Sequence, residues 1–239
     1  MRLSDLGPRY AETDLTNFPV EPWATWTNLI FLAVIVYWTW RLRGQRRRHM
    51  VLAAALPLLT IGWFGGTIYH ATRSSVVWTL LDWCPIVVLV LLAAWWLWRR
   101  LLPSAALAFC ATLLPLLVAG ALARWLANSG PAGISASYAI LAVGVVVPAV
   151  GNCVRRSGMW LRLAVVLGCF AVALIFRVCD APLAQAGWPH GSHYLWHVFG
   201  GLATFFMFGF LYALRAGDPT ACPGLAVAQE CRVPGVRGV

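Results

Sequence analysis

Five ionisable side chains lie within or at the ends of strongly apolar stretches of the chain. They are His70, Asp82, Asp180, His193 and His197. An ionisable group at membrane depth is costly, so it persists mainly where it faces a bundle interior, a partner group or water. Imidazole nitrogens and carboxylate oxygens are also ligands for divalent metal ions. These residue types therefore predict a metal site within a membrane-embedded bundle.

The two histidines nearest the C-terminus have the spacing of a helical metal motif. His193 and His197 are four residues apart, which places both rings on one helical face. Gly200 and Thr204 continue that face with small and polar side chains, so we expect it to pack inward. A third ligand from another helix would complete the arrangement typical of catalytic zinc, which keeps one position open for water. We assign His70 as that ligand.

Asp82 is the candidate for proton transfer. Pro85 follows three residues later, and its ring frees the carbonyl of Leu81 and loosens the helix beside the acid. We interpret Asp82 as a general acid and base, or as the group that orients a metal-bound water. The alternative is an ion pair with Arg177.

Other polar residues nearby have simpler explanations. Arg177 and Asp180 are three residues apart, which favours a local ion pair. His49 lies in an arginine-rich loop, where we expect it to be exposed to solvent. His190 lies in a Trp-Pro-His-Gly loop, and a ligand role is less favoured there.

The composition is that of an integral membrane protein. Hydrophobic residues make up 61% of the chain and charged residues 11%, with a mean hydropathy of +0.75. A soluble domain has about a quarter charged residues. The net charge of +10 comes entirely from arginine, a usage typical of a GC-rich bacterial genome. These arginines flank apolar segments and interleave with tryptophan, as membrane anchors do, so we expect no nucleic-acid partner.

Seven segments are long enough to span a bilayer, at about 20 apolar residues each. Their expected bounds are 23–41, 50–70, 76–98, 103–126, 134–153, 159–179 and 193–214. We therefore predict an all-α integral membrane protein with a polar N-terminal segment over 1–22 and a seven-helix bundle over 23–214. The cytoplasmic tail, 215–239, is expected to be disordered.

The arginines also predict the orientation of the bundle. Of the 18 basic residues, 13 fall on the side of the first, third and fifth connections and the C-terminal tail. The positive-inside rule then places the N-terminus outside and the C-terminus in the cytoplasm of a bacterial inner (plasma) membrane. The three histidines and six of the eight acidic residues come to the outer side, so the site faces the periplasm or exterior.

Four short stretches, in this order, resemble the alkaline ceramidase family of seven-helix membrane hydrolases. They are Glu21-Pro22-Trp23-Ala24-Thr25-Trp26-Thr27-Asn28-Leu29, Gly65-Gly66-Thr67-Ile68-Tyr69-His70, Leu81-Asp82-Trp83-Cys84-Pro85-Ile86 and Gly191-Ser192-His193-Tyr194-Leu195-Trp196-His197. The resemblance implies a zinc amidase that cleaves a membrane sphingolipid, ceramide, or a related N-acyl lipid, into a fatty acid and a lipid amine. It also implies that His70, His193 and His197 bind zinc and that Asp82 handles protons.

The chain departs from the family pattern at the position four residues before the first histidine. The family has a serine there, and this chain has Gly66. The serine could stabilise an oxyanion, and losing one such donor costs roughly 10²–10³ in rate. Thr67 is adjacent but rotated about 100° around the helix. Thr67, Arg177 and Asp180 are further candidates to support the site from behind the ligands.

The resemblance also implies a calcium site near the N-terminus. Glu12 and Glu21 match its pattern and Asp14 offers another oxygen ligand, but Arg9 stands where an acid is expected. Hard oxygen ligands of this kind suit Ca²⁺.

Two other classes of function stay open. Paired histidines in a bundle could hold a haem, although haem carriers usually place histidines at both depths, and here the inner half has none. The chain could also be a non-catalytic lipid-binding receptor or scaffold that retains the metal site, which Gly66 makes credible.

Overall fold

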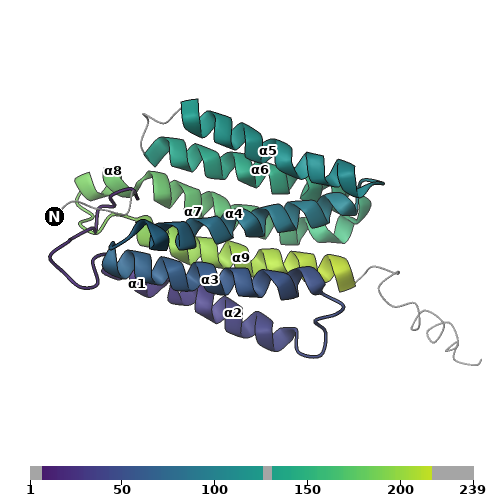
Figure 1. Ribbon diagram of the computed structural model, residues 1–239, viewed down its shortest axis with the longest axis horizontal. Helices are drawn as coiled ribbons and strands as arrows, with labels where there is room; N and C mark the ends of the chain where they lie inside the picture. The colour runs from purple at the N-terminus through teal and green to yellow at the C-terminus, as the bar shows by residue number, and fades with distance from the viewer. Residues whose placement is uncertain (1–6, 126–130, 217–239) are drawn as a thin grey trace, which may run out of the picture.

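The structure, a computed structural model, describes residues 7–125 and 131–216, and all its regular elements in that part of the chain are helices. Their bounds are α1 Pro22–Thr27, α2 Leu29–Arg41, α3 Met50–Thr72, α4 Val76–Arg99, α5 Ala105–Trp125, α6 Pro131–Arg155, the 3-10 turn Ser157–Met159, α7 Trp160–Val178, α8 Asp180–Gln185 and α9 His193–Ala216. The long helices run side by side along one axis, with α8 and the N-terminal segment at the same end (Figure 1).

Five helical segments are long and apolar enough to cross a membrane. They are Met50–Thr72, Val76–Arg99, Tyr138–Arg155, Ser157–Val178 and His193–Ala216. The predicted all-helical membrane architecture is thereby confirmed in its coarse form. A shorter apolar stretch, Ala105–Val118, lies in α5. The count of seven crossings and the orientation of the termini stay predictions.

The first predicted span differs from the structure because it is divided. α1 ends at Thr27 and α2 begins at Leu29, so Asn28 stands at the join. At the other end of the bundle, α9 continues through Arg215 to Ala216. The remainder of the predicted tail, 217–239, and the first six residues lie outside the described residues.

Two adjacent glycines let α3 and α4 approach closely. A Cβ built on Gly65 would lie 2.7 Å from the carbonyl carbon of Leu81, closer than real side chains come. On Gly66, a Cβ would overlap an Asp82 oxygen. The pair of glycines therefore brings the start of α4, with its acid, against the last turns of α3.

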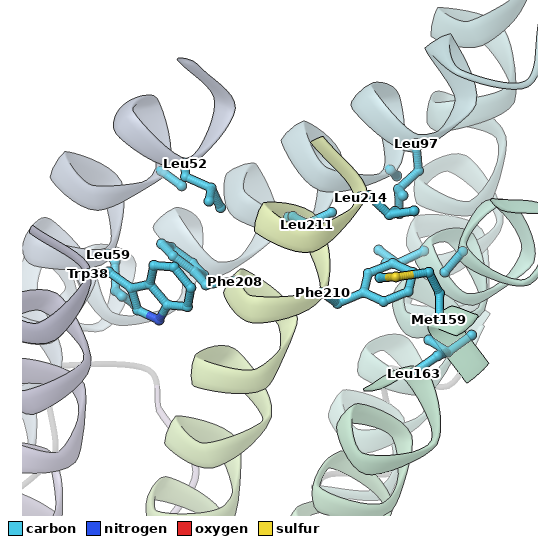
Figure 2. Packing of buried hydrophobic residues seen from close by; sticks show 14 of the residues in the cluster. Trp38, Leu52, Leu59, Leu97, Met159, Leu163, Phe208, Phe210, Leu211 and Leu214 are labelled. Carbon is cyan, nitrogen blue, oxygen red and sulfur yellow. The ribbon is translucent and has the colours of Figure 1, made fainter. Parts of the chain in front are cut away.

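The apolar core lies toward the end of the bundle opposite α8. Figure 2 shows buried apolar side chains packed together there, among them Trp38, Leu97, Leu163 and Phe210. Phe210 is fully buried, and Trp38 is 4% exposed. Trp38 and Leu97 lie in the last turns of α2 and α4, Leu163 lies in the first turn of α7, and Phe210 lies near the end of α9.

Arginines at this same end bind helix carbonyls. Arg48 donates to the carbonyl of Ala216 at 3.1 Å, and Arg156 donates to that of Leu214 at 3.2 Å. The last carbonyls of a helix have no partner within the helix, and a nearby cation also complements the helix dipole. These arginines therefore cap the C-terminal turn of α9.

The expectation that His49 is solvated is wrong. Its side chain is 3% exposed and stacks on the Tyr212 ring, with centroids 4.1 Å apart. Burial, together with the charges of Arg48, Arg215 and Arg41, lowers the pKa of His49 to about 4. The histidine is neutral at pH 7, which allows it to pack among cations.

Candidate metal centre

The three predicted ligands meet at the end of the bundle that carries α8. His70 lies in the last turn of α3, and His193 and His197 lie in the first turns of α9. All three side chains are buried, at 1%, 1% and 4% exposure. One ring nitrogen from each histidine can be chosen so that all three nitrogens lie within 4.8 Å of one another. The predicted convergence of the histidines is therefore confirmed.

The spacing of the nitrogens fits a small divalent ion. The Nε2 atoms of His193 and His197 are 3.3 Å apart. Two nitrogens bound to zinc at 2.0–2.1 Å in tetrahedral geometry would be separated by about 3.3 Å. In addition, His70 Nε2 is buried without a hydrogen-bond partner. A metal ion would satisfy this nitrogen, which otherwise costs free energy.

Hydrogen bonds behind two of the rings set their tautomers. His70 Nδ1 lies 2.6 Å from Glu21 Oε2, and His197 Nδ1 lies 2.9 Å from Asn28 Oδ1. Because both partners accept, each Nδ1 carries the proton and each Nε2 keeps its lone pair. This is the arrangement in which metal-ligating histidines are usually held. Asn28 reaches His197 from the join between α1 and α2.

Glu21 is the residue whose role the sequence reasoning missed. Its side chain is fully buried, and its other oxygen, Oε1, accepts from Thr13 at 2.5 Å and pairs with Arg73. Burial raises the pKa of Glu21, but the hydrogen bond and charge of His70 and the charge of Arg73 outweigh it, so the pKa lies below its ordinary value. The carboxylate therefore stays ionised and orients His70.

The other two acids of the predicted calcium site have separate roles. Glu12 accepts from the backbone N–H groups of Trp23 and Ala24, at 2.8 and 3.0 Å, and so caps α1. Burial raises the pKa of Glu12 to about 7 against these hydrogen bonds. Asp14 is exposed and accepts from nearby side chains of its own turn. The calcium site stays a prediction, and these contacts do not support it.

Asp82 lies against α3 beside the histidines. The space that a side chain at Gly66 would need is occupied by Asp82 Oδ1, and the amide nitrogen of Asn28 lies 3.4 Å from the same Cβ position. Asn28 in turn bonds His197. Gly66, where the alkaline ceramidase pattern has a serine, is therefore the position that accommodates the acid. Thr67 does not replace the serine, because its hydroxyl donates to the carbonyl of Trp63 at 2.7 Å within α3.

The predicted ion pair between Arg177 and Asp180 is absent from the described contacts. α7 ends at Val178 and α8 begins at Asp180, so helical register is not kept across the join. Asp180 instead accepts from three backbone N–H groups, those of Ala11 at 2.9 Å, Ser192 at 2.8 Å and His193 at 2.9 Å. It therefore fixes the start of α9, and with it the first ligand of that helix.

The N-terminal segment contributes an aromatic residue that the sequence did not single out. The Tyr10 ring stacks on His193 with centroids 3.5 Å apart and planes at 8°. His190, by contrast, is exposed and tilts against Trp23 at 5.6 Å, so it is not part of the cluster. Among the described residues, His70, His193 and His197 form the group placed to hold a metal ion.

No model of a protein family matches this chain, and no curated protein matches it either.

Proposed function

We propose that the chain is a membrane-embedded zinc amidase that hydrolyses the amide of ceramide or a related N-acyl lipid to a fatty acid and a lipid amine. The observation that carries the proposal is the convergence of three buried imidazoles within 4.8 Å. Two of the rings are already held in the tautomer that a metal requires, by Glu21 and Asn28. Such preorganisation is costly to build and has no evident structural purpose.

His70, His193 and His197 are the residues that would hold the ion. Three imidazole nitrogen donors would suit zinc, which catalytic sites commonly hold with three protein ligands. Zinc bound there supplies Lewis-acid chemistry, since it polarises an amide carbonyl and lowers the pKa of water to about 7. Glu21 and Asn28 keep the ligand rings in place, and Asp180 holds the backbone of His193.

Asp82 is the group that moves protons in this proposal. Its carboxylate accepts a proton from the attacking water and returns it to the nitrogen of the departing amine, so the group is unchanged after one turnover. Its position beside Gly66 and Asn28 supports this role. The Gly66 position also explains how the chain dispenses with the family serine, because the acid fills the space that the serine would need.

We further propose that the bundle crosses the membrane seven times, with α1 and α2 together as the first crossing and α5 as the fourth. The arginines that cap helix ends, such as Arg48 and Arg156, lie at the end opposite the histidines. The positive-inside rule then places the site on the periplasmic or outer side of the plasma membrane. A lipid would enter from the outer leaflet.

Metal content and lipid hydrolysis test the proposal together. The purified chain is expected to hold one zinc per molecule and to release fatty acid from at least one N-acyl lipid of a broad panel. His197→Ala should lose both properties. His190→Ala is the matched control, because this exposed histidine lies on the same side outside the cluster and should keep both.

Three outcomes separate the alternatives. Absence of both zinc and metal-dependent hydrolysis overturns the proposal. Stoichiometric zinc without hydrolysis of any lipid favours a non-catalytic lipid-binding receptor or scaffold. An intense Soret absorption in the absence of zinc favours haem.

A further inference from the structure

Arg177 is a cation at membrane depth surrounded by aromatic rings. It lies in the last turn of α7, and its Cζ atom is 5.1 Å from the ring centroid of Trp196, 5.2 Å from that of Tyr138 and 6.0 Å from that of Tyr10. Because Tyr10 stacks on His193, a single ring separates this guanidinium from a candidate metal ligand. Arg177 therefore belongs to the immediate surroundings of the metal centre.

Within residues 7–125 and 131–216, no carboxylate forms an ion pair with the Arg177 guanidinium. The acids near this end are engaged elsewhere: Asp180 accepts from backbone N–H groups, and Glu21 binds His70 and Arg73. Among the described residues, both buried ion pairs belong to Glu21, and neither involves Arg177. Asp82 is close enough for its charge to interact with that of Arg177, but the two side chains do not form a salt bridge.

The aromatic rings around Arg177 do not neutralise its charge or accept hydrogen bonds from all its N–H donors. Ring faces attract a cation but leave its charge in place. The guanidinium has five N–H donors in a planar fork. Among the residues whose side chains the structure describes, no carboxylate forms an ion pair with these donors. A positive charge held at this depth without a counterion is costly unless an anion binds there.

Arg73 shows what a purely structural arginine looks like at the same end. Its guanidinium pairs with Glu21 and also donates to the backbone carbonyls of Gly7 at 3.2 Å and Pro8 at 3.0 Å. It is 3% exposed, with its charge balanced by a buried carboxylate. Arg177 lacks any such balance.

We propose that Arg177 binds an anionic group of the substrate. The preferred substrate is then an N-acyl lipid that carries a carboxylate or a phosphate on its amine part, in place of a neutral ceramide. The planar fork of a guanidinium matches both anions through two parallel hydrogen bonds. The charge belongs on the amine part because the acyl chain is hydrocarbon. This inference rests on the proposed amidase function and names its substrate class.

Matched lipids of equal chain length test the substrate class. N-oleoylglycine carries a carboxylate, N-oleoylethanolamine carries a neutral hydroxyl in its place, and N-oleoyl-phosphoethanolamine carries a phosphate. We expect kcat/KM for one or both anionic lipids to exceed that for the neutral lipid at least tenfold. Comparison of kcat/KM for the two anionic lipids shows whether the site prefers a carboxylate or a phosphate. Equal kcat/KM for all three overturns the inference while leaving the amidase proposal intact.

Substitution of the arginine tests its role directly. Arg177→Gln is expected to lower kcat/KM for the anionic lipid at least tenfold and to change that for the neutral lipid less than twofold. For the anionic lipid, the kcat/KM of Arg177→Lys should fall between those of the wild type and Arg177→Gln. An equal loss on all lipids would assign Arg177 to the reacting carbonyl and overturn the inference. The control is Arg162→Gln, near the other end of α7, which should leave every value unchanged.

A binding measurement decides the inference even without turnover. N-oleoylglycine should raise the thermal unfolding midpoint of the zinc-loaded wild type more than N-oleoylethanolamine does. This difference should vanish in Arg177→Gln, provided that the variant keeps its zinc, which reports that it is folded. Equal stabilisation of the wild type by both lipids contradicts the inference. Failure to hydrolyse any lipid, together with preferential binding of the anionic one, would overturn only the amidase proposal.

Discussion

The two ends of the bundle differ in how they use buried side chains. At the histidine end, polar groups are buried together and several bond one another, as in the Glu21–His70 and Asn28–His197 pairs. At the opposite end, the interior is filled by apolar residues such as Trp38 and Phe210 (Figure 2). Arg48 and Arg156 at that end donate to helix carbonyls. Within residues 22–216 both acids, Asp82 and Asp180, belong to the histidine end.

This contrast indicates that one end of the bundle contributes mainly stability and the other holds the candidate site. Close packing of the apolar end provides stability in a bilayer, where association depends on packing and hydrogen bonds. At the polar end, burying ionisable groups in fixed positions costs part of that stability, but a functional site requires such fixed positions. Mutations at the two ends should therefore separate chemistry from stability.

The largest expected effect is on chemistry alone, at Asp82. Asp82→Asn removes the group that we propose to move protons while keeping its size. Hydrolysis of the best lipid should fall by about 10²–10⁴. Zinc content and the unfolding midpoint should stay close to those of the wild type. Full activity of the variant would remove Asp82 from the mechanism.

The apolar end should show the reverse behaviour. Phe210→Ala leaves a cavity in the core, and the free energy of unfolding should fall by about 3 kcal/mol. The affinity for zinc in the folded protein should not change, which a competition titration with a chelator would measure. Phe206→Ala is the control, because this ring of the same helix is 37% exposed. A large loss of zinc affinity in Phe210→Ala would show that the ends are coupled.

Removing the support behind a ligand should weaken the site without abolishing it. Glu21→Gln keeps the shape of the side chain but loses the charge that holds His70 and Arg73. Zinc affinity is expected to fall by about 10–100-fold. Asp14→Asn, in the same segment but exposed, should leave the affinity unchanged. If both variants bind zinc equally well, the role assigned to Glu21 is wrong.

Restoring the serine that the alkaline ceramidase pattern has should not help. In Gly66→Ser, the new side chain would occupy the position of Asp82 Oδ1 and displace the carboxylate. Activity should therefore drop, by about tenfold, although the resemblance alone would favour a gain. Steady-state hydrolysis at equal zinc content distinguishes the two expectations, and a faster variant would contradict the geometry described for Asp82.

The smallest expected effect is a pH dependence of stability at the apolar end. The pKa of His49 is lowered to about 4 by burial, so the unfolded chain binds its proton more readily than the folded one. The stability contributed by neutral His49 is present above its ordinary pKa and is lost as the pH falls from about 6.5 toward 4. Between pH 7 and pH 5 the loss is about 1–2 kcal/mol. His49→Phe, which keeps the stacking on Tyr212, should be less sensitive over that range; an unchanged pH profile would argue against a neutral buried His49.

The sequence predicted the features that depend on spacing and depth. The interval between His193 and His197 and the position of His70 at a helix end sufficed to predict that the three meet. Contacts between distant segments could not be predicted in this way. The Glu21–His70 bond depends on how the N-terminal segment folds back onto α3, and Asn28 reaches His197 because the first span is divided.

Errors arose where local patterns were extended across a break or into a loop. The Arg177–Asp180 pair assumed one continuous helix, but α7 ends at Val178 between them. His49 was expected to be solvated because its neighbours in sequence are charged. Its ring instead packs on Tyr212 from α9, a contact between residues far apart in the chain.

The most direct test of the central claim is zinc K-edge X-ray absorption on the purified chain, combined with its metal content. The account predicts one zinc per chain, with three imidazole nitrogens at about 2.0–2.1 Å and one further light-atom ligand. The imidazole signal should decrease in His70→Ala. A chain that takes up no zinc, or whose zinc spectrum is the same in wild type and His70→Ala, would contradict the account.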